Sequence, residues 1–379
     1  MDFKIPLSFP VFNGNENAYL QRAISSRHIA TSGEFITEFE RRLSTRLKTH
    51  EAVALNSGTS SLHLAMVLLG ISPGDEVICQ SFTFCASANP VVYLGATPIF
   101  VDSEKESWNI CPEILEDTIL SRISKGKKPK AIVIVHLFGM PAKLKEIMEI
   151  SDKYNIPVLE DAAEAFGSQY LGKPCGTFGK IGVISFNGNK IMSAGGGGAL
   201  IANDTASVQH ARLLSTQARE DLPFYHHLEI GYNYKMNNLS AAVGVAQLEQ
   251  LDTFIQARRH INQRYRILLE DFPGISFQTE SPDSQSNYWL TTILIDKQIT
   301  GFSNIELKSA LLKHDIESRF LWKPLHTQPV FNMTPYYGGS MAERLFENGL
   351  CLPSSVNLTL QDQESIVEVI RKELSKTFK

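Results

Sequence analysis

The sequence predicts an α/β protein in which a mostly parallel sheet forms a large domain and a smaller α+β domain follows it. Between about residue 50 and residue 205, short apolar runs alternate with longer amphipathic stretches, which is the rhythm of βαβ units. That rhythm changes after Asp271. The length of 379 residues suits two domains at roughly 100–200 residues each. We expect the large domain to span residues 1–250 and the small domain residues 251–379.

The alternating region contains the elements predicted for the large domain. Several strands are continuous in Val and Ile, as strands buried on both faces tend to be. The predicted strands are Glu76–Gln80, Thr97–Val101, Ala131–His136, Pro157–Glu160, Ile181–Phe186 and Ala199–Ala202. The predicted helices between them are Ser60–Leu69, Pro112–Ser124 and Ala142–Tyr154. One long helical pattern, Ser240–Leu269, is expected to lead into the small domain.

The small domain shows a mixed pattern. A strand is expected near Trp289–Ile295, and helices are expected near Ile305–His314 and Leu360–Leu374. A segment rich in Pro and aromatic residues, Trp322–Tyr337, is expected to be a loop.

Charge and cysteine content exclude several classes of protein. Lys and Arg number 36 against 40 Asp and Glu, so nucleic acid or an anionic membrane is not expected as the main partner. The five cysteines are scattered and form no CxxC, which predicts neither a disulfide framework nor a zinc knuckle. No apolar run reaches the roughly 18 residues of a membrane span. A soluble, cytoplasmic protein is the expectation.

The first candidate site is the segment Asn56–Ser61, which stands directly before a helical pattern. Small hydroxyl residues and a glycine at a helix start offer N–H groups, hydroxyl donors and the positive end of the helix dipole, which together suit a phosphate. The same residue types also form ordinary helix N-caps. The GxxxxGK[ST] motif of a Walker loop is missing.

The second candidate site is the pair of acids at the end of the strand predicted over Pro157–Glu160. Ligands bind at the carboxyl ends of strands in open α/β sheets, where Asp161 would lie. A carboxylate there can hold a cationic ring nitrogen or a metal ion. The alternative is that Glu160 or Asp161 caps the helix that follows.

The third candidate is Lys190, which stands in an otherwise uncharged stretch close to the tetraglycine Gly195–Gly198. A desolvated amine is nucleophilic and can bond to a carbonyl carbon, whereas most lysines extend to the surface. The four glycines predict close backbone approach or positive φ, with a mobile loop as the alternative. The polar and aromatic segment Gly231–Asn238 is, taken alone, a helix-capping loop.

Together the three candidates match the needs of pyridoxal phosphate (PLP). Its phosphate needs a helix N-terminus, its ring nitrogen needs a carboxylate, and its aldehyde needs a lysine. Phe82 or Phe84 could provide a stacking surface for the ring. A nicotinamide oxidoreductase is improbable because GxGxxG is missing.

The sequence resembles the DegT/DnrJ/EryC1/StrS sugar aminotransferases, which are fold-type I PLP enzymes, over nearly its whole length. The matching segments, in the family's order, are Ile5–Ser8, Gly33 with Phe39 and Glu40, Asn56–Ser60, Gly74–Val77, Thr83 with Phe84, Glu160–Ala163, Ser185 with Phe186 and Lys190, Gly231–Tyr234, and Pro324–His326. The resemblance implies a mostly parallel, seven-stranded sheet in the large domain. It also implies PLP, or its pyridoxamine form PMP, as cofactor.

The resemblance further implies roles for individual residues. Lys190 would bond to the cofactor and carry the proton, and Asp161 would pair with the ring nitrogen. Phe84 and Ala163 would lie against the two ring faces, with Glu164 near the ring hydroxyl or the sugar. The phosphate would be held by Gly58, Thr59, Ser60, Ser185 and Asn233, the last from the neighbouring subunit of a homodimer with shared sites. The nucleotide sugar would be bound by Glu164, Arg319, Trp322 and His326.

By resemblance, the reaction is transfer of an amino group from L-glutamate to C4 of a nucleotide-linked 4-keto-6-deoxy sugar, for surface glycan biosynthesis. Relatives that dehydrate the sugar carry histidine where this chain has Lys190, which disfavours a dehydratase. Amination at C3 of a 3-keto sugar and a PLP-dependent dehydratase or lyase stay as alternatives. The presence of Lys190 and Asp161 argues against a non-catalytic member.

Overall fold

The centre of the molecule is a mostly parallel sheet of eight strands in the described residues, in the order β1-β9-β8-β5-β4-β2-β3-β14. The structure is a computed structural model that describes residues 3–12, 14–49 and 51–375. The strands are β1(Glu51–Leu55), β2(Glu76–Gln80), β3(Thr97–Val101), β4(Ala131–Val135), β5(Val158–Asp161), β8(Ile181–Ser185), β9(Gly198–Ala202) and β14(Tyr336–Tyr337). Only β9 runs antiparallel to its neighbours, β1 and β8. Seven of these described strands precede residue 203, as the resemblance implied, and the two-residue β14 extends the sheet.

Helices cover both faces of this sheet, and alternate strand residues point to each face. Ile132 and Ile134 join one core, and Ala131 and Val133 join the other. The first core includes side chains of α2(Glu34–Leu47), α5(Pro112–Ser124), α6(Leu144–Tyr154) and α8(Asn238–Leu248). The second includes side chains of α3(Gly58–Leu68), α4(Asn89–Tyr93) and α7(Thr205–Ser215). The strands are apolar on both sides because both faces are covered.

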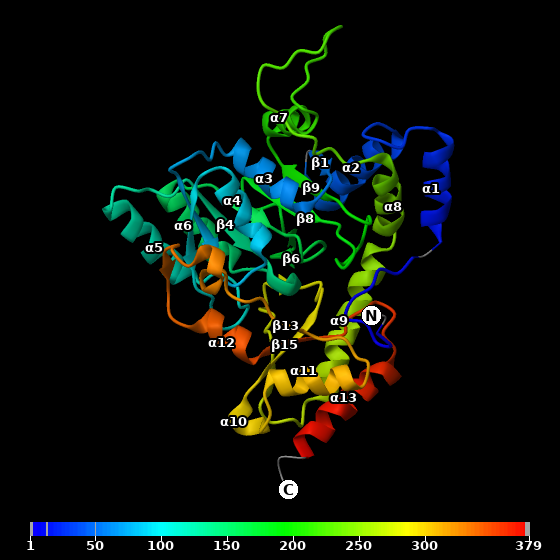
Figure 1. Cartoon of the computed structure of the whole chain (residues 1–379), viewed down its shortest axis with the longest axis vertical. Helices are drawn as coiled ribbons and strands as arrows, with labels where there is room; N and C mark the ends of the chain where they lie inside the picture. Colours follow the sequence, from blue (N-terminus) through cyan, green and yellow to red (C-terminus); the bar gives the residue numbers. More distant parts are fainter. Residues whose placement is uncertain (1–2, 13, 50, 376–379) are drawn as a thin grey trace.

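A smaller antiparallel sheet forms the other end of the molecule, below the large sheet in Figure 1. Its strands, in order, are β10(Ile275–Phe277), β12(Thr291–Ile295), β15(Gly349–Leu352) and β13(Arg319–Phe320). It shares a core with α9(Leu251–Leu268), α11(Asn304–Lys313) and α13(Leu360–Ser375). The remaining α-helices are α1(Asn15–Ser25), α10(Lys297–Thr300) and α12(Met341–Asn348). The 3₁₀ helices are η1(Cys85–Ser87), η2(Leu137–Gly139), η3(Leu325–Thr327) and η4(Pro329–Phe331). A short third sheet consists of β6(Gln169–Tyr170), β7(Lys173–Pro174) and β11(Ser284–Gln285).

The helix predicted over Ser240–Leu269 is wrong as a single element, because the chain forms α8 and α9 with a break between them. Gln250 leaves the helical region at φ −107° and ψ 1°. Both helices bury apolar side chains close to the break, so the apolar periodicity of the sequence continues across it and does not reveal where one helix ends and the next begins. The strands predicted to end at His136 and Phe186 end one residue earlier, at Val135 and Ser185. The strand predicted to end at Glu160 ends one residue later, at Asp161.

The loop predicted over Trp322–Tyr337 contains η3, η4 and the edge strand β14.

We propose the division into residues 1–250 and 251–379 for the two domains, since α9 begins at Leu251 and its side chains join the core of the smaller sheet. Residues 376–379 of that division lie outside the described part. In the described chain, no helix has both the length and the apolar character needed to cross a bilayer.

Candidate active site

A cavity of about 520 Å³ lies beside the carboxyl ends of β5 and β8, and we call it the lysine cavity. Its walls include the start of α3, the turn after β8 and the tetraglycine segment. The residues that line it are Asn56, Ser57, Gly58, Thr59, Leu62, Thr83, Phe84, Ala86, Ser87, Val135, Asp161, Ala163, Glu164, Ser185, Asn187, Asn189, Lys190, Gly196, Gly197, Trp289, Arg319 and Trp322. The cavity therefore gathers all three candidate segments of the sequence in one place.

Lys190 points into the lysine cavity. Its side chain is 14% exposed, so it does not extend to the surface. The Nζ atom lies 3.5 Å from Glu164 Oε1 and 4.1 Å from the centre of the Trp289 ring. The amine is thus held among a carboxylate and an aromatic face, where a carbonyl compound in the cavity could reach it.

Asp161 is buried at the floor of the same cavity, at 4% exposure. Ser87 Oγ donates a hydrogen bond to Oδ2 at 2.7 Å, and the Ala163 N–H donates to Oδ1 at 3.1 Å. Burial raises the pKa of Asp161, while these hydrogen bonds and the charge of Lys190 act in the opposite direction. A protonated ring nitrogen would provide the cation that such a buried carboxylate lacks. The next described element after β5 is the strand β6, so Asp161 does not cap a helix.

Glu160 points away from Asp161 and has a structural role. Its carboxylate accepts the backbone N–H groups of Gly176, Phe178 and Gly179 at 2.5–2.8 Å and the Nε2–H of His136 at 3.1 Å. The His136 Nδ1 accepts the Ala142 N–H, which places the ring proton on Nε2. Adjacent strand residues point to opposite faces, so only one of the two acids can enter the cavity.

Glu164 is the second buried acid in the cavity. The Phe138 N–H donates to its Oε2 at 2.7 Å, and its Oε1 faces Lys190. Burial raises the pKa of Glu164, and the nearby Lys190 charge lowers it again in part. The two acids and one amine make the cavity polar at one end.

The start of α3 forms a cradle that suits a phosphate. Ser57 is the N-cap and accepts the Ser60 N–H at 3.0 Å, which leaves the first N–H groups of the helix at the cavity wall. A Cβ at Gly58 would lie 2.9 Å from the Ser185 Cβ, and one at Gly198 would lie 2.6 Å from the Ser57 carbonyl carbon. The glycines thus let three backbone segments meet. Gly197 has φ +123°, and Gly198 lies against the Ser57 backbone, which confirms the prediction of positive φ or close backbone approach in the tetraglycine.

A second cavity of about 600 Å³ adjoins the first, and we call it the aromatic cavity. It is lined by Phe3, Leu7, Ser8, Phe9, Pro10, Phe138, Gly188, Asn189, Trp289, Leu290, Glu317, Arg319, Phe320, Trp322 and Cys351. The rings of Phe138 and Trp322 are nearly parallel, at 7° and 6.2 Å between centres. Asn189, Trp289, Arg319 and Trp322 line both cavities.

Most residues singled out in the sequence line the lysine cavity, namely Gly58, Thr59, Phe84, Asp161, Ala163, Glu164, Ser185, Lys190, Arg319 and Trp322. Ser60 and Asn233 lie outside its lining. The Ser60 hydroxyl donates to Asn56 Oδ1 at 2.6 Å, and the Asn233 carbonyl accepts from Asn56 Nδ2 at 3.1 Å. Both residues therefore contact the cavity only indirectly in their own chain, through Asn56.

His326 lines neither cavity. Its Nδ1 lies 2.6 Å from Ser81 Oγ and its Nε2 lies 3.0 Å from Glu343 Oε1. Its ring stacks on Tyr336 at 3.7 Å between centres. The imidazole thus has both nitrogens engaged within the protein.

Ser87, Asn189 and Trp289 are among the lining residues to which sequence reasoning assigned no role in the site. Ser87 follows the recognised Phe84 closely and, as a hydroxyl residue just after β2, carried a weak local signal. The Trp289 indole N–H donates to the Asn189 carbonyl at 2.6 Å, although the two residues are 100 positions apart. No local pattern predicts such a contact.

The chain matches the family model described as DegT/DnrJ/EryC1/StrS aminotransferase family over residues 11–371. It is 45% identical over 374 residues to EpsN of Bacillus subtilis (strain 168), whose name describes a pyridoxal phosphate-dependent aminotransferase, covering 98% of this chain and 96% of that protein. It is 38% identical to a GDP-perosamine synthase of Escherichia coli O157:H7, covering 97% and 98%. Among solved structures, the PMP form of Spr1654 from Streptococcus pneumoniae, titled a sugar aminotransferase, is similar with a TM-score of 0.89 and 25% identity, covering 99% of this chain and 100% of that chain.

Proposed function

Because this chain belongs to the DegT/DnrJ/EryC1/StrS aminotransferase family, we propose that it transfers the amino group of L-glutamate to C4 of a nucleotide-linked 4-keto-6-deoxy sugar. It is a PLP-dependent sugar aminotransferase. The observation that supports the proposal is the meeting of Lys190, the buried Asp161 and the start of α3 in one cavity. These are an amine, an acid and an anion cradle, which are the groups that PLP needs.

The proposed roles follow from where each side chain lies. When bound, PLP supplies an aldehyde that accepts the amino group and a ring that withdraws electrons from the reacting carbon. Lys190 would bond to the aldehyde and, when free, move the proton at the sugar carbon. Asp161 would keep the proton on the ring nitrogen. The half-exposed Phe84 would lie on one face of the ring and Ala163 on the other.

The nucleotide sugar would enter through the aromatic cavity. Trp322 and Arg319 line both cavities, so a substrate that contacts them extends from the open aromatic side towards Lys190. Aromatic and apolar walls suit a base and a deoxy sugar. The Arg319 side chain is 62% exposed and pairs with Glu317 Oε1 at 2.8 Å, so a diphosphate would share or take over the guanidinium from Glu317. The similarity to a GDP-perosamine synthase supports amination of a nucleotide sugar. The product would serve surface glycan synthesis.

An absorbance experiment tests this reaction. Purified enzyme with bound PLP should lose its visible band when glutamate is added, because the amino group passes to the cofactor. A panel of UDP-, GDP- and dTDP-linked 4-keto-6-deoxy sugars should then be supplied, and one of them should restore the band and yield a 4-amino sugar by mass spectrometry. Restoration by a 3-keto sugar alone, or release of water without 2-oxoglutarate, would replace the proposal with one of its alternatives.

We further propose that the enzyme is a homodimer in which Asn233 serves the partner's phosphate cradle. The segment between α7 and α8 projects from the body of the molecule (Figure 1) and exposes apolar side chains. Tyr225, Leu228 and Ile230 are 75–86% exposed, which indicates a covering surface. Asn233 itself does not line its own lysine cavity.

Subunit mixing tests the shared site. Lys190→Ala and Asn233→Ala proteins should each be inactive or weak alone. When they are unfolded together and refolded, the mixed dimer should regain one intact site, with Lys190 from one subunit and Asn233 from the other. No recovery in a verified mixed dimer would place Asn233 and Lys190 in the same subunit's site, and full activity of Asn233→Ala alone would show that Asn233 is not needed.

A further inference from the structure

Trp289 lies between the two cavities and contacts the turn that carries Lys190. The face of its ring lies 4.1 Å from the Lys190 Nζ, which is a cation–π distance. Its indole N–H donates to the carbonyl of Asn189, the residue directly before the lysine. One side chain therefore contacts the lysine at both its amine and its backbone.

A second donor comes to the same carbonyl from the N-terminal segment. The Ser8 hydroxyl donates to the Asn189 carbonyl at 3.0 Å, so this oxygen accepts two hydrogen bonds. The N-terminal segment is itself held in place, because the Leu7 N–H donates to Glu317 Oε2 at 2.9 Å. The lysine turn is thus tied to residues that lie 181 and 100 positions away.

Arg258 joins these two donors. Its guanidinium is 1% exposed, donates through Nη1 to the Trp289 carbonyl, and donates through Nη2 to Ser8 Oγ at 3.0 Å. Within the described residues, no carboxylate forms an ion pair with it, and burial lowers the pKa of Arg258 to about 9. A buried cation without a counterion is costly to a fold. A cost of this kind is expected where the side chain positions a functional group.

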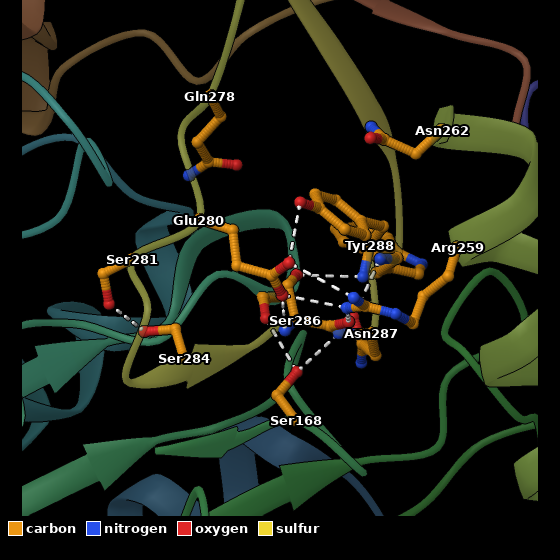
Figure 2. A network of polar contacts seen from close by, with 12 residues as sticks. Ser168, Arg259, Asn262, Gln278, Glu280, Ser281, Ser284, Ser286, Asn287 and Tyr288 are labelled. Atoms are coloured by element: carbon orange, nitrogen blue, oxygen red, sulfur yellow. Dashed lines mark hydrogen bonds and ion pairs between the residues drawn. The ribbon is translucent and has the colours of Figure 1, made fainter. Parts of the chain in front are cut away.

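The chain around Trp289 is fixed on its other side by the network in Figure 2. The side-chain amide of Asn287 donates through Nδ2 to the Glu164 carbonyl at 3.0 Å, and its Oδ1 accepts the backbone N–H of Trp289 at 2.8 Å. The ion pair of Arg259 and Glu280, at 2.8 Å, lies in the same network. Trp289 is therefore hydrogen-bonded to a segment that also contacts the backbone of Glu164, the second cavity acid.

We propose that Trp289 is a positioning residue for Lys190 and that the ammonium group of Lys190 lies on the Trp289 ring when no cofactor is bound. Ser8 and Arg258 fix the position of that ring relative to the turn that carries Lys190. This inference rests on Lys190 being the cofactor lysine, as proposed above. A role in core packing alone would change only the access of a reagent to the lysine amine, in proportion to the side-chain volume that each variant removes.

The test is the reaction rate of Lys190 in the cofactor-free protein with trinitrobenzenesulfonate, followed by mass spectrometry of the lysine peptide. In Trp289→Leu the rate should rise roughly three- to tenfold, because the ammonium loses its aromatic face. In Trp289→Phe, which keeps a ring, the rise should stay below about twofold. Trp108→Leu removes a buried indole outside both cavities and should leave the Lys190 rate unchanged.

Each outcome separates this inference from the proposed function. If added PLP does not protect Lys190 in the wild-type protein, the cofactor assignment fails. If PLP protects Lys190 but folded Trp289→Leu reacts at the wild-type rate, only the role of Trp289 fails. Should Trp289→Leu not fold, the double variant Ser8→Ala with Trp289→Phe removes both donors to the Asn189 carbonyl. Its Lys190 should react about threefold faster, and an unchanged rate would overturn the proposal.

Discussion

The lysine cavity and the aromatic cavity adjoin each other but are built in different ways. The lysine cavity is lined mainly by residues 56–197, at strand ends and a helix start of one sheet, and it contains two buried acids and an amine. The aromatic cavity draws on six separate segments from Phe3 to Cys351 and presents mostly apolar and aromatic side chains. Chemistry that is common to a cofactor can be built on one sheet edge. A surface that selects a substrate is assembled from distant parts of the chain.

The comparison predicts that removing a charged group of the lysine cavity lowers kcat strongly. The largest loss of kcat is expected for Lys190. Lys190→Ala should lower kcat by roughly a thousandfold or more, because no other amine in the lining can take its place. The far-ultraviolet circular dichroism and the oligomeric state should stay as in the wild type. A variant that still transfers the amino group at the normal rate would contradict the mechanism.

Asp161→Asn should give the next largest effect. The amide is nearly isosteric and keeps a partner for Ser87, but it does not hold a proton on a ring nitrogen. We expect kcat to fall roughly a hundredfold, with the visible spectrum of the bound cofactor altered. Ser87→Ala is the matched control, since it keeps the carboxylate and should cost less. Equal losses in the two variants would argue against the charge of Asp161.

The aromatic cavity should respond in KM rather than in kcat. Trp322→Leu removes the ring that stacks on Phe138 and should raise KM for the nucleotide sugar about tenfold. The half-reaction with glutamate, followed by loss of the visible band, should change little. If both half-reactions slow by the same factor, Trp322 belongs functionally to the lysine cavity instead.

The smallest effect concerns the pH dependence of stability in the cofactor-free protein. Burial raises the pKa of Glu164 above its unfolded value, so its contribution to stability is fully present below that unfolded value of about 4.5 and is lost as the pH rises through the folded pKa. Glu164→Gln should flatten the fall in unfolding free energy over that range. Denaturant titrations from pH 4 to pH 8 measure the slope. An unchanged slope would show that Lys190 compensates the carboxylate fully.

Local patterns predicted those elements whose periodicity and composition agree with their final environment. The strands β2 and β3 and the helix α5 have the bounds that their residues predicted. The helix pair α8 and α9 was predicted as one, because apolar spacing continues across the turn. The edge strand β14 could not be predicted, since two residues carry no period and pair with β3 only after the chain has folded.

The sequence by itself determined the family, through the order of its matching segments. It also pointed to the cofactor and to the amine, the acid and the helix start of the lysine cavity, because a phosphate, a ring nitrogen and an aldehyde each demand a particular residue type at a strand end or a helix start. Only the tertiary structure decided that Glu160 faces away from the site, that His326 lies outside both cavities, and that Trp289 meets Lys190. Those outcomes depend on contacts between segments 100 or more positions apart or on the facing of one strand residue. Such contacts arise from packing, to which local periodicity is blind.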